Sequence, residues 1–439
     1  MKFYNREREL KNLDRIRELS LQEGQMTVFV GRRRIGKTQL LLKATEQQPT
    51  LYFFVTRKAE NMLCRDFIEE IQSKLNVPMG DYSSFGRLFE HLMIHAKERP
   101  FNLIIDEFQD FGRINPAIFS EMQKHWDVHK KTSKMNLLIC GSIYSLMHHI
   151  FEDKKEPLFS RAGQIIHLKS FDVSVLHEIL SDYNPDYTHE DLLALYTFTG
   201  GVAWYVELFV KYGAFARDEM IRLISEENSP FLNEGKNLLI EEFGKDYAIY
   251  FSIMECIARG LTTRGDIESY LGQIEIGGYL SRLERDFSMI SQQRPICAKP
   301  SSKQVRYQIE DNFMTFWFRF IFKYQNFIES RSFSLLENMI RRDYDMFSGM
   351  MLERYFKSKY KESGQYTNLG RFWDRKGENE IDLIAVNELD KTVEFVEIKR
   401  NPSRIDFKKL ESKAAYFLQN TKECKGYSIT YKGLSLENM

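Results

Sequence analysis

The sequence predicts an α/β protein of several domains, with a parallel sheet first, a helical middle and a smaller α/β domain last. Aliphatic runs in residues 26–30, 103–105 and 136–140 each end in a polar or glycine-containing segment, a pattern typical of buried parallel strands. Apolar residues then recur at helical spacing from residue 171 to about Gly244. Two further apolar runs flank a polar turn between residues 380 and 400. The length of 439 residues allows about three domains.

The composition is that of a globular protein without a dominant charge. Lys+Arg and Asp+Glu both number 62, so any attraction to nucleic acid or to a membrane surface must be local. The five cysteines form no CxxC pair, and the charged amino-terminal segment has no apolar signal-peptide core, which favours a cytoplasmic protein with reduced thiols. The most apolar stretch, "FMTFWFRFIF", is too short to span a bilayer, so we expect no membrane partner.

A phosphate-binding loop follows the first predicted strand. Gly31 begins the segment "GRRRIGKT", which matches G-x-x-x-x-G-K-[ST] between a strand and an apolar helix. Backbone N–H groups of such a loop face the phosphates, Lys37 would reach the β- and γ-phosphates, and the Thr38 hydroxyl would bind Mg²⁺. We therefore expect ATP and Mg²⁺ as cofactors. The predicted nucleotide-binding residues of the loop are Gly31, Arg34, Ile35, Gly36, Lys37, Thr38 and Gln39.

Two acids follow the second aliphatic run. Because the carboxyl ends of parallel strands face the nucleotide site, Asp106 is expected in the Mg²⁺ shell, and Glu107 is expected to orient or deprotonate the attacking water. Lys37 and Glu107 are thus the predicted catalytic residues of this domain. The alternative is a strand that merely ends in surface acids. The three loop arginines, residues 32–34, are interpreted as solvated side chains or as contacts to a phosphate or a partner domain.

These segments resemble the archaeal-type P-loop ATPases, which are related to the AAA+ and STAND classes. The resemblance is carried by "FYNREREL", "VGRRRIGKT", "IIDEFQ", "SRAG" and "TGGVAWYV". It implies that Asn5 and Arg6 lie near the adenine and that Ser142, after the third strand, senses the γ-phosphate. Ser142 also suits an ordinary Gly-Ser turn. Arg161 is either an arginine finger or a salt-bridging surface residue. Ala203 stands where the family usually has proline, which leaves the lid's contact with nucleotide open.

The middle of the chain is expected to hold two helical modules. Residues 171–245 would form a lid that senses the nucleotide or a plain helical linker. Residues 246–312 read as three short helices followed by a hairpin, the order of a winged helix, which serves as a DNA-binding or a protein-interaction module. The candidate DNA contacts are Tyr279, Arg282, Arg285, Lys299, Lys303 and Arg306.

The last predicted domain, residues 313–439, carries acidic residues within apolar segments that resemble strands. Asp382 lies within "IDLIA", where the alternation of an exposed strand fails, and a buried carboxylate needs a metal or a basic partner. Glu397 and Lys399 share one face of the next strand, and Glu353 lies on an amphipathic helix upstream. Carboxylates on neighbouring strands suit a hard cation such as Mg²⁺. Charged residues that merely protect a half-exposed sheet are the alternative.

The order Glu…Asp…Glu-x-Lys resembles the core of the PD-(D/E)xK nucleases. The resemblance implies a restriction-endonuclease-like fold, with Glu353, Asp382 and Glu397 as metal ligands and with Glu397 and Lys399 as catalytic residues. Two functions follow. One is an ATP-hydrolysing switch whose last domain cleaves double-stranded DNA with a bound metal. The other is a STAND-like regulatory ATPase whose winged helix and nuclease-like domain are inactive modules that bind DNA, a protein partner or another copy of the chain.

Overall fold

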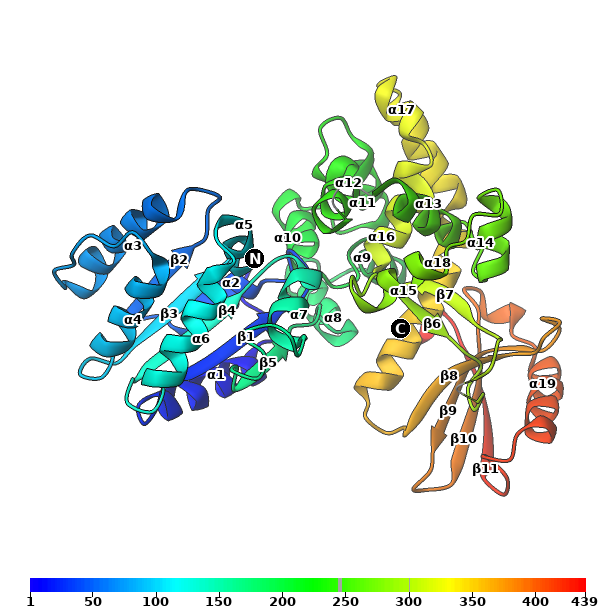
Figure 1. Ribbon diagram of the computed structural model, residues 1–439. Helices are drawn as coiled ribbons and strands as arrows, with labels where there is room; N and C mark the ends of the chain where they lie inside the picture. Colours follow the sequence, from blue (N-terminus) through cyan, green and yellow to red (C-terminus); the bar gives the residue numbers. More distant parts are fainter. Residues whose placement is uncertain (244–246, 300) are drawn as a thin grey trace. The chain divides into compact units, whose positions relative to one another are not determined.

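The structure, a computed structural model, describes residues 1–243, 247–299 and 301–439 (Figure 1). The chain divides into two compact units, Lys2–Lys169 and Ser170–Met439. The expected boundary between lid and winged helix, from Gly244 to residue 246, lies outside the described residues. Among the described helices, none combines the length and the apolar character needed to cross a membrane.

The first unit contains the predicted parallel sheet. Its five strands are ordered β2-β3-β4-β1-β5, and every neighbouring pair is parallel. The central strands β3 and β4 are buried along their whole length, which explains their continuous aliphatic sequences. The strands are β1 Gln25–Val30, β2 Thr50–Phe54, β3 Phe101–Asp106, β4 Met135–Cys140 and β5 Gln164–His167.

Helices cover both faces of this sheet (Figure 1). Alternate residues of β1 point to opposite faces, so Phe29 packs with α1 and α2, whereas Val28 and Val30 pack with α3–α7. The carboxyl ends of β1, β3 and β4 therefore meet at one edge, where the phosphate loop begins. The helices are α1 Glu7–Ser20, α2 Lys37–Ala44, α3 Glu60–Leu75, α4 Phe85–His95, η1 Phe108–Asp110, α5 Phe111–Ile114, α6 Ala117–His129 and α7 Tyr144–Glu152.

The second unit begins with helices and then adds a short hairpin. Three short helices, α13–α15, are followed by the antiparallel pair β6 and β7, the element order expected of a winged helix. The aromatic stretch after β7 is core, because Phe313, Phe316 and Trp317 are buried. The elements are α8 Val173–Tyr183, α9 His189–Thr199, α10 Ala203–Tyr212, α11 Arg217–Ser225, α12 Pro230–Phe243, α13 Tyr247–Ala258, α14 Arg264–Tyr270, α15 Gly277–Arg285, β6 Ile290–Gln293, β7 Arg306–Ile309, α16 Asn312–Phe316, a π-helical segment Trp317–Phe322 and α17 Gln325–Glu329.

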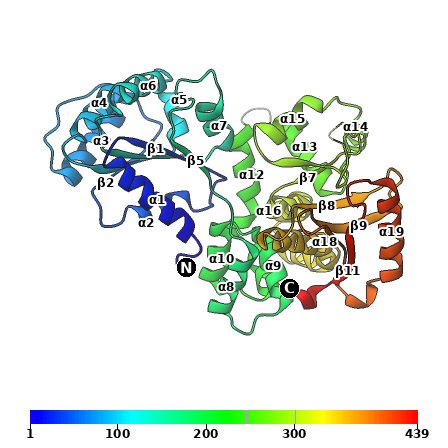
Figure 2. The same cartoon turned by 90° about the horizontal axis from the view of Figure 1, so that it is seen from below.

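A four-stranded mixed sheet completes the chain. The strands are ordered β11-β10-β9-β8; β8–β9 and β9–β10 are antiparallel, whereas β10–β11 is parallel. Helix α19 packs its Leu410 and Phe417 on Val393 and Phe395 of β10, and α18 lies beside β8 and β9 (Figure 2). The elements are α18 Phe333–Glu362, β8 Asn368–Trp373, β9 Glu380–Asn387, β10 Thr392–Ile398, η4 Pro402–Arg404, α19 Phe407–Asn420, β11 Ser428–Leu434 and η5 Leu436–Asn438.

The glycine pair of "TGGVAWYV" secures the start of the second unit. The Phe171 N–H donates to the Gly201 carbonyl at 2.8 Å, and a Cβ on Gly201 would lie 2.2 Å from the Phe171 carbonyl oxygen. Gly201 also has φ +76°, a left-handed conformation that side chains disfavour. The motif therefore acts here as a tight backbone joint between the residues that precede α8 and the end of α9.

We expect Gly201→Ala to lower the free energy of unfolding by about 3 kcal/mol, because it adds a backbone clash to the cost of a left-handed side chain. Gly213→Ala is the matched control: its φ is +65°, but no atom lies within 4 Å of the position that an added Cβ would take, so about 1 kcal/mol is expected. Urea unfolding of the full chain, followed by circular dichroism, measures both. Equal shifts in the urea midpoint would contradict the role of the joint.

Candidate functional site

The phosphate loop joins β1 to α2 at the carboxyl edge of the first sheet. Gly36 precedes α2 with φ +94°, so glycine is the residue that fits there. The Lys37 ammonium is buried and donates to the carbonyl oxygens of Gly31 and Arg32, both at 2.8 Å. The lysine thus folds back over the loop and places its charge inside it, where phosphate oxygens would be received.

The remaining loop residues have different surroundings. Arg34 has a left-handed φ of +69°, and Gln39 lies in the first turn of α2. Ile35 buries its side chain among the apolar residues of α1 and α2, so only its backbone is available to a phosphate. The predicted loop residues are therefore brought together, although Ile35 also anchors the loop to the core.

Asp106 is the centre of the polar contacts beside this loop. Its Oδ2 accepts from the Thr38 hydroxyl at 2.6 Å and from the Tyr52 hydroxyl at 2.9 Å. Its Oδ1 accepts from the Cys140 thiol at 3.0 Å and from the Glu107 backbone N–H at 2.9 Å. Four donors thus replace water around a carboxylate that is 5% exposed. The sequence indicated Asp106 and Thr38, but not Tyr52 or Cys140.

Burial and the Asp106 charge keep the two additional donors protonated. Desolvation, followed by the negative charge of Asp106, raises the pKa of the Tyr52 hydroxyl well above its usual value. The same two causes raise the pKa of the Cys140 thiol. Both groups therefore remain hydrogen-bond donors at neutral pH, and Cys140 is a structural thiol here rather than a reactive one.

Glu107 and Ser142 are hydrogen-bonded to each other. The Ser142 hydroxyl donates to Glu107 Oε2 at 2.6 Å, and the Gln109 amide donates to the same oxygen at 2.5 Å. Glu107 itself has a left-handed φ of +55°, directly after the end of β3. The predicted water-orienting acid and the predicted γ-phosphate sensor are thus adjacent, and Gln109 is a third member that the sequence did not single out.

Two other residues raised by the sequence have defined contacts within the first unit. Arg161 forms an ion pair with Asp127 of α6 at 3.1 Å and donates to the Phe159 carbonyl. These contacts are those of the salt-bridging residue that the sequence offered as one alternative. Arg6 is buried at the start of α1 and donates to the Lys169 carbonyl at 2.8 Å. Asn5, beside it, has φ +42°. Arg6 therefore ties the amino-terminal segment to the last residue of this unit.

The acids of the second unit converge on Lys399. Its ammonium lies 2.8 Å from Asp382 Oδ2, 2.9 Å from Glu397 Oε1 and 3.1 Å from the Ile398 carbonyl oxygen. The Ile398 N–H also donates to Asp382 Oδ2 at 2.8 Å. Asp382 is 9% exposed and Glu397 is 6% exposed. Two carboxylates and a carbonyl around one point are oxygen ligands of the type that Mg²⁺ and other hard cations take, so the residues fit such an ion.

Glu353 approaches the same cluster from α18. Arg371 of β8 lies 3.1 Å from its Oε2 and also 3.0 Å from Glu380 Oε1. Burial raises the pKa of the Glu353 carboxyl to about 7, the Asp382 charge adds to the rise, and the charges of Arg371 and Lys399 oppose it. The helix acid is therefore electrostatically linked to the strand acids, with Arg371 as its direct partner.

The cluster contains basic residues that sequence reasoning did not assign to it. Lys413 of α19 lies 3.5 Å from Glu397 Oε2. Arg306 of β7 pairs with Glu380 at 2.8 Å and lies over the Trp373 ring at 4.5 Å. The sequence suggested a DNA contact for Arg306, whereas in the structure its charge is engaged by the last domain. Four acids and four bases thus face one another: Glu353, Glu380, Asp382, Glu397, Arg306, Arg371, Lys399 and Lys413.

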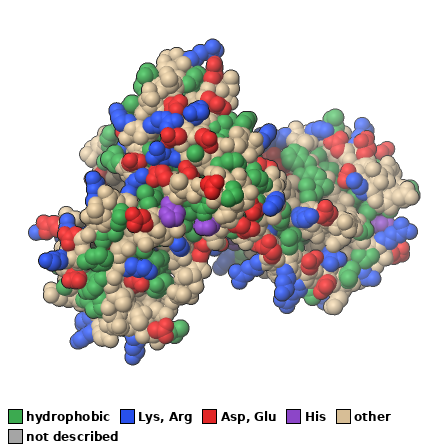
Figure 3. Space-filling view, turned by 180° about the vertical axis from the view of Figure 1, so that it is seen from behind, with side chains coloured by type: hydrophobic (Ala, Val, Ile, Leu, Met, Phe, Trp, Pro, Cys, Tyr) green, Lys and Arg blue, Asp and Glu red, His purple; other side chains and the backbone are tan. Residues whose placement is uncertain are grey.

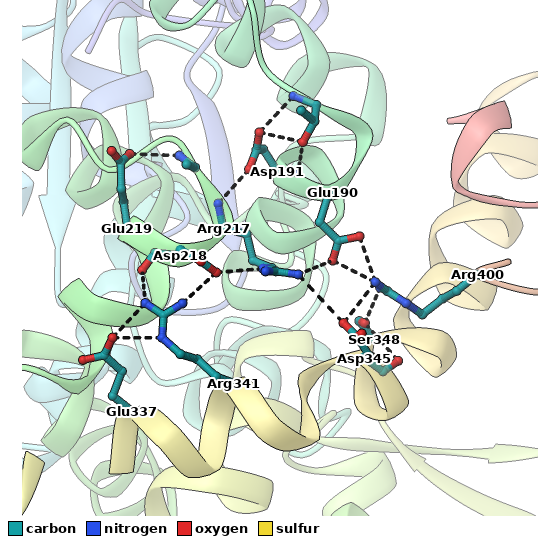
Figure 4. A network of polar contacts seen from close by, with 12 residues as sticks. Glu190, Asp191, Arg217, Asp218, Glu219, Glu337, Arg341, Asp345, Ser348 and Arg400 are labelled. Atoms are coloured by element: carbon teal, nitrogen blue, oxygen red, sulfur yellow. Dashed lines mark hydrogen bonds and ion pairs between the residues drawn. The ribbon is translucent and has the colours of Figure 1, made fainter. Parts of the chain in front are cut away.

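The residue after Lys399 is held by α9 and α18 (Figure 4). Arg400 donates to both Glu190 oxygens at 2.9 and 2.8 Å, to Asp345 at 3.1 Å and to the Ser348 hydroxyl at 2.6 Å. Glu190 lies in the first turn of α9 and also pairs with Arg217 of α11 at 3.4 Å. A chain of charged contacts thus connects the predicted lid with the strand that carries the acids.

The other candidate DNA contacts lie on α15 and between β6 and β7. Arg282 lies 3.7 Å from Asp286, and its guanidinium lies 5.7 Å from the Tyr250 ring, against which Tyr279 also packs. Arg285, Lys299 and Lys303 are exposed. Figure 3 shows basic and acidic side chains intermixed on the face seen from behind. The charges on this face therefore give no strong electrostatic argument for DNA.

Comparison with known proteins identifies the family. A family model described as an ATPase domain predominantly from Archaea matches residues 3–209, and one described as archaeal and bacterial proteins of unknown function matches residues 317–411. An uncharacterized protein of Methanocaldococcus jannaschii is 31% identical over 407 residues, which are 90% of this chain and 87% of that protein. The solved Walker-type ATPase of Pyrococcus abyssi is 20% identical, with a TM-score of 0.55 over 72% of this chain and 96% of that one, and shares the fold. The phosphate loop, the Asp106 centre and these matches together show that the chain belongs to the P-loop ATPases found predominantly in Archaea.

Proposed function

We propose that this protein is an ATP-hydrolysing switch whose second unit carries a Mg²⁺-dependent nuclease site for double-stranded DNA. The observation that carries the proposal is the convergence of Asp382, Glu397 and the Ile398 carbonyl on Lys399, in a chain whose first unit is a P-loop ATPase domain. Each half of the proposal rests on its own residues, so each can be tested separately.

For ATP hydrolysis, the arrangement around Asp106 supplies the required groups. Lys37 would exchange its two carbonyl contacts for phosphate oxygens, and Thr38 with Asp106 would hold Mg²⁺. Glu107 would orient or deprotonate the attacking water. Because Ser142 and Gln109 both donate to one Glu107 oxygen, a γ-phosphate that draws the Ser142 hydroxyl toward itself would remove one of these two donors and make Glu107 more available to the water. The proposed sensor would thus act through the proposed base.

For DNA cleavage, the support is the order of elements and the donor set. A long helix, three antiparallel strands, a helix and a parallel strand follow one another, as in the PD-(D/E)xK core that the sequence resembles. When bound, Mg²⁺ would polarise the scissile phosphate and lower the pKa of a water molecule. Asp382 and Glu397 would hold the ion, and Lys399, displaced from between them, would stabilise the developing charge. Glu353 would complete the set from α18.

One observation favours the second candidate, a STAND-like regulator without nuclease activity. The four acids and four bases of the cluster already balance in charge, so the buried carboxylates are compensated by protein groups alone. Such a cluster would also suit a module that only binds DNA or a protein. Metal-dependent cleavage distinguishes the two candidates.

The Arg400 contacts suggest how nucleotide state would reach the acid cluster. Glu190 at the start of α9 holds Arg400, and Arg400 is covalently next to Lys399. A movement of α9 relative to α18 would therefore pull on the backbone beside the lysine that occupies the proposed metal position. We propose this ion pair as the link between the lid and the cluster.

The ATPase half predicts distinct effects for two substitutions. Lys37→Ala should abolish ATP binding, because it removes the charge inside the loop. Glu107→Gln should preserve binding and slow phosphate release about 100-fold or more, because a water-orienting base is lost. Binding of a fluorescent ATP analogue and phosphate release measure the two effects, with the exposed Glu98→Gln as the control. Turnover that survives both substitutions would overturn the assignment.

The nuclease half predicts nicking of supercoiled plasmid with Mg²⁺ or Mn²⁺. Asp382→Asn and Glu397→Gln should each reduce the nicking rate about 100-fold or more, because a metal ligand is lost. Glu394→Gln is the matched control, since Glu394 lies on the same strand but pairs with Tyr360 and Lys432. Equal nicking by all of these proteins would exclude the site. Salt-sensitive DNA binding without cleavage would favour the regulator.

The proposed link predicts a loss of coupling in Arg400→Ala. In the wild type, a non-hydrolysable ATP analogue should change amide hydrogen exchange in residues 397–400, and in Arg400→Ala that change should disappear while nucleotide affinity is retained. Arg404→Ala, an exposed arginine four residues later, is the control. A nucleotide-dependent change of the same size in all three proteins would show that coupling does not pass through Arg400.

A further inference from the structure

Helices α4 and α6 of the ATPase domain present glutamate and histidine side chains to each other. His125 and His129 lie four residues apart on α6, so they occupy the same face of that helix. Glu90 faces them from α4. Both helices are fixed on the sheet by buried apolar residues, among them Phe89 on α4 and Trp126 on α6. The three polar side chains therefore extend from rigid backbone.

The two separations between the carboxylate and the imidazoles are closer to those of metal ligands than to those of optimal hydrogen bonds. Glu90 Oε1 lies 3.2 Å from His125 Nδ1 and 3.6 Å from His129 Nε2, and all three atoms lie within 4.8 Å of one another. Zinc with bonds of about 2.0–2.1 Å separates tetrahedral ligands by roughly 3.3–3.4 Å, between the two values. A carboxylate paired with a charged nitrogen usually lies closer, at about 2.7–2.9 Å.

His129 supplies a second observation. Its Nε2 is shielded from solvent and has no hydrogen-bond partner among the described residues, and its 3.6 Å separation from Glu90 is too long for a hydrogen bond. A buried ring nitrogen without a partner is costly, and an ion placed between it and the carboxylate would satisfy it. Glu90 has a side chain that is 40% exposed, so such an ion would be reached from solvent.

We propose that Glu90, His125 and His129 form a binding site for a divalent transition-metal ion of the zinc class. Two imidazole nitrogens and one carboxylate oxygen are a donor set that zinc prefers over Mg²⁺. Three protein ligands leave a fourth coordination position for water or for a group of a partner molecule. The site is independent of the proposed nuclease and ATPase chemistry.

The topology places this site away from the nucleotide. Helix α6 leads from the carboxyl end of β3 to the amino end of β4, and His129 is its last residue. The phosphate loop lies at the opposite, carboxyl edge of the same sheet. The ion would therefore act as a clamp between α4 and α6, which are separated in sequence by β3, η1 and α5, and would stabilise the folded first unit.

The test uses the full chain without an affinity tag, dialysed against chelator and then kept in excess Mg²⁺ to occupy hard-cation sites. Calorimetric titration with Zn²⁺ should show one ion per chain, and the melting temperature should rise with Zn²⁺ concentration. Co²⁺ in place of Zn²⁺ should give the intense visible absorption of a tetrahedral ion. The affinity for a fluorescent ATP analogue should be the same with and without Zn²⁺.

Two variants locate the ion. His129→Gln and Glu90→Gln should each weaken Zn²⁺ binding about tenfold or more and remove the Co²⁺ absorption. His91→Gln is the matched control on α4, because His91 contacts Tyr82 instead, and it should bind Zn²⁺ as the wild type does. Glu90→Gln keeps the shape of a partly exposed side chain, so its result does not depend on a folding defect. Absence of one-to-one binding, or equal affinity in all three variants, would show that the cluster is only an ion-pair network.

Discussion

The first unit depends on a single buried carboxylate. Asp106 accepts hydrogen bonds from Thr38, Tyr52, Cys140 and the Glu107 backbone, which belong to the phosphate-loop helix, two neighbouring strands and the strand end itself. An ionised group at this depth is tolerable only when its oxygens are satisfied, so these elements must remain in register. The hydrogen bond between Thr38 and Asp106 also joins the two residues proposed to hold the metal of the nucleotide.

In the second unit, basic side chains rather than neutral donors compensate the carboxylates. Its acids are compensated by lysines and arginines from β7, β8, α19 and the residue after β10, so that the last sheet is joined electrostatically to the β6–β7 hairpin and to α18. Breaking one such pair leaves the other charge buried and unpaired, which costs more than the pair contributes. The half-buried ion pair between Arg306 and Glu380 joins the β6–β7 hairpin to the last sheet.

The sequence predicted those features that depend on residues close to one another along the chain. The strand–loop–helix spacing of Lys37 and Thr38, the acids that end β3 and the strand parity of Glu397 and Lys399 all involve residues close in sequence, and the structure brings each group together. Tyr52, Cys140, Arg371 and Lys413 could not be assigned, because their roles depend on which strands and helices become neighbours. The same limit applies to Glu90 with His125: no sequence spacing relates a residue of α4 to one of α6.

The Lys399 ammonium would compete with any cation for the carboxylates of the acid cluster. The ammonium is tethered by its own chain next to Asp382 and Glu397, so it is present there at an effective concentration of roughly millimolar or higher, whatever the composition of the solution. A divalent ion would have to displace it, and occupancy of the cluster would then be set by ion availability and by whatever moves the lysine. In the proposed metal site, Lys399 would thus govern access of the ion, and the neighbouring Arg400 is bound by Glu190 of α9.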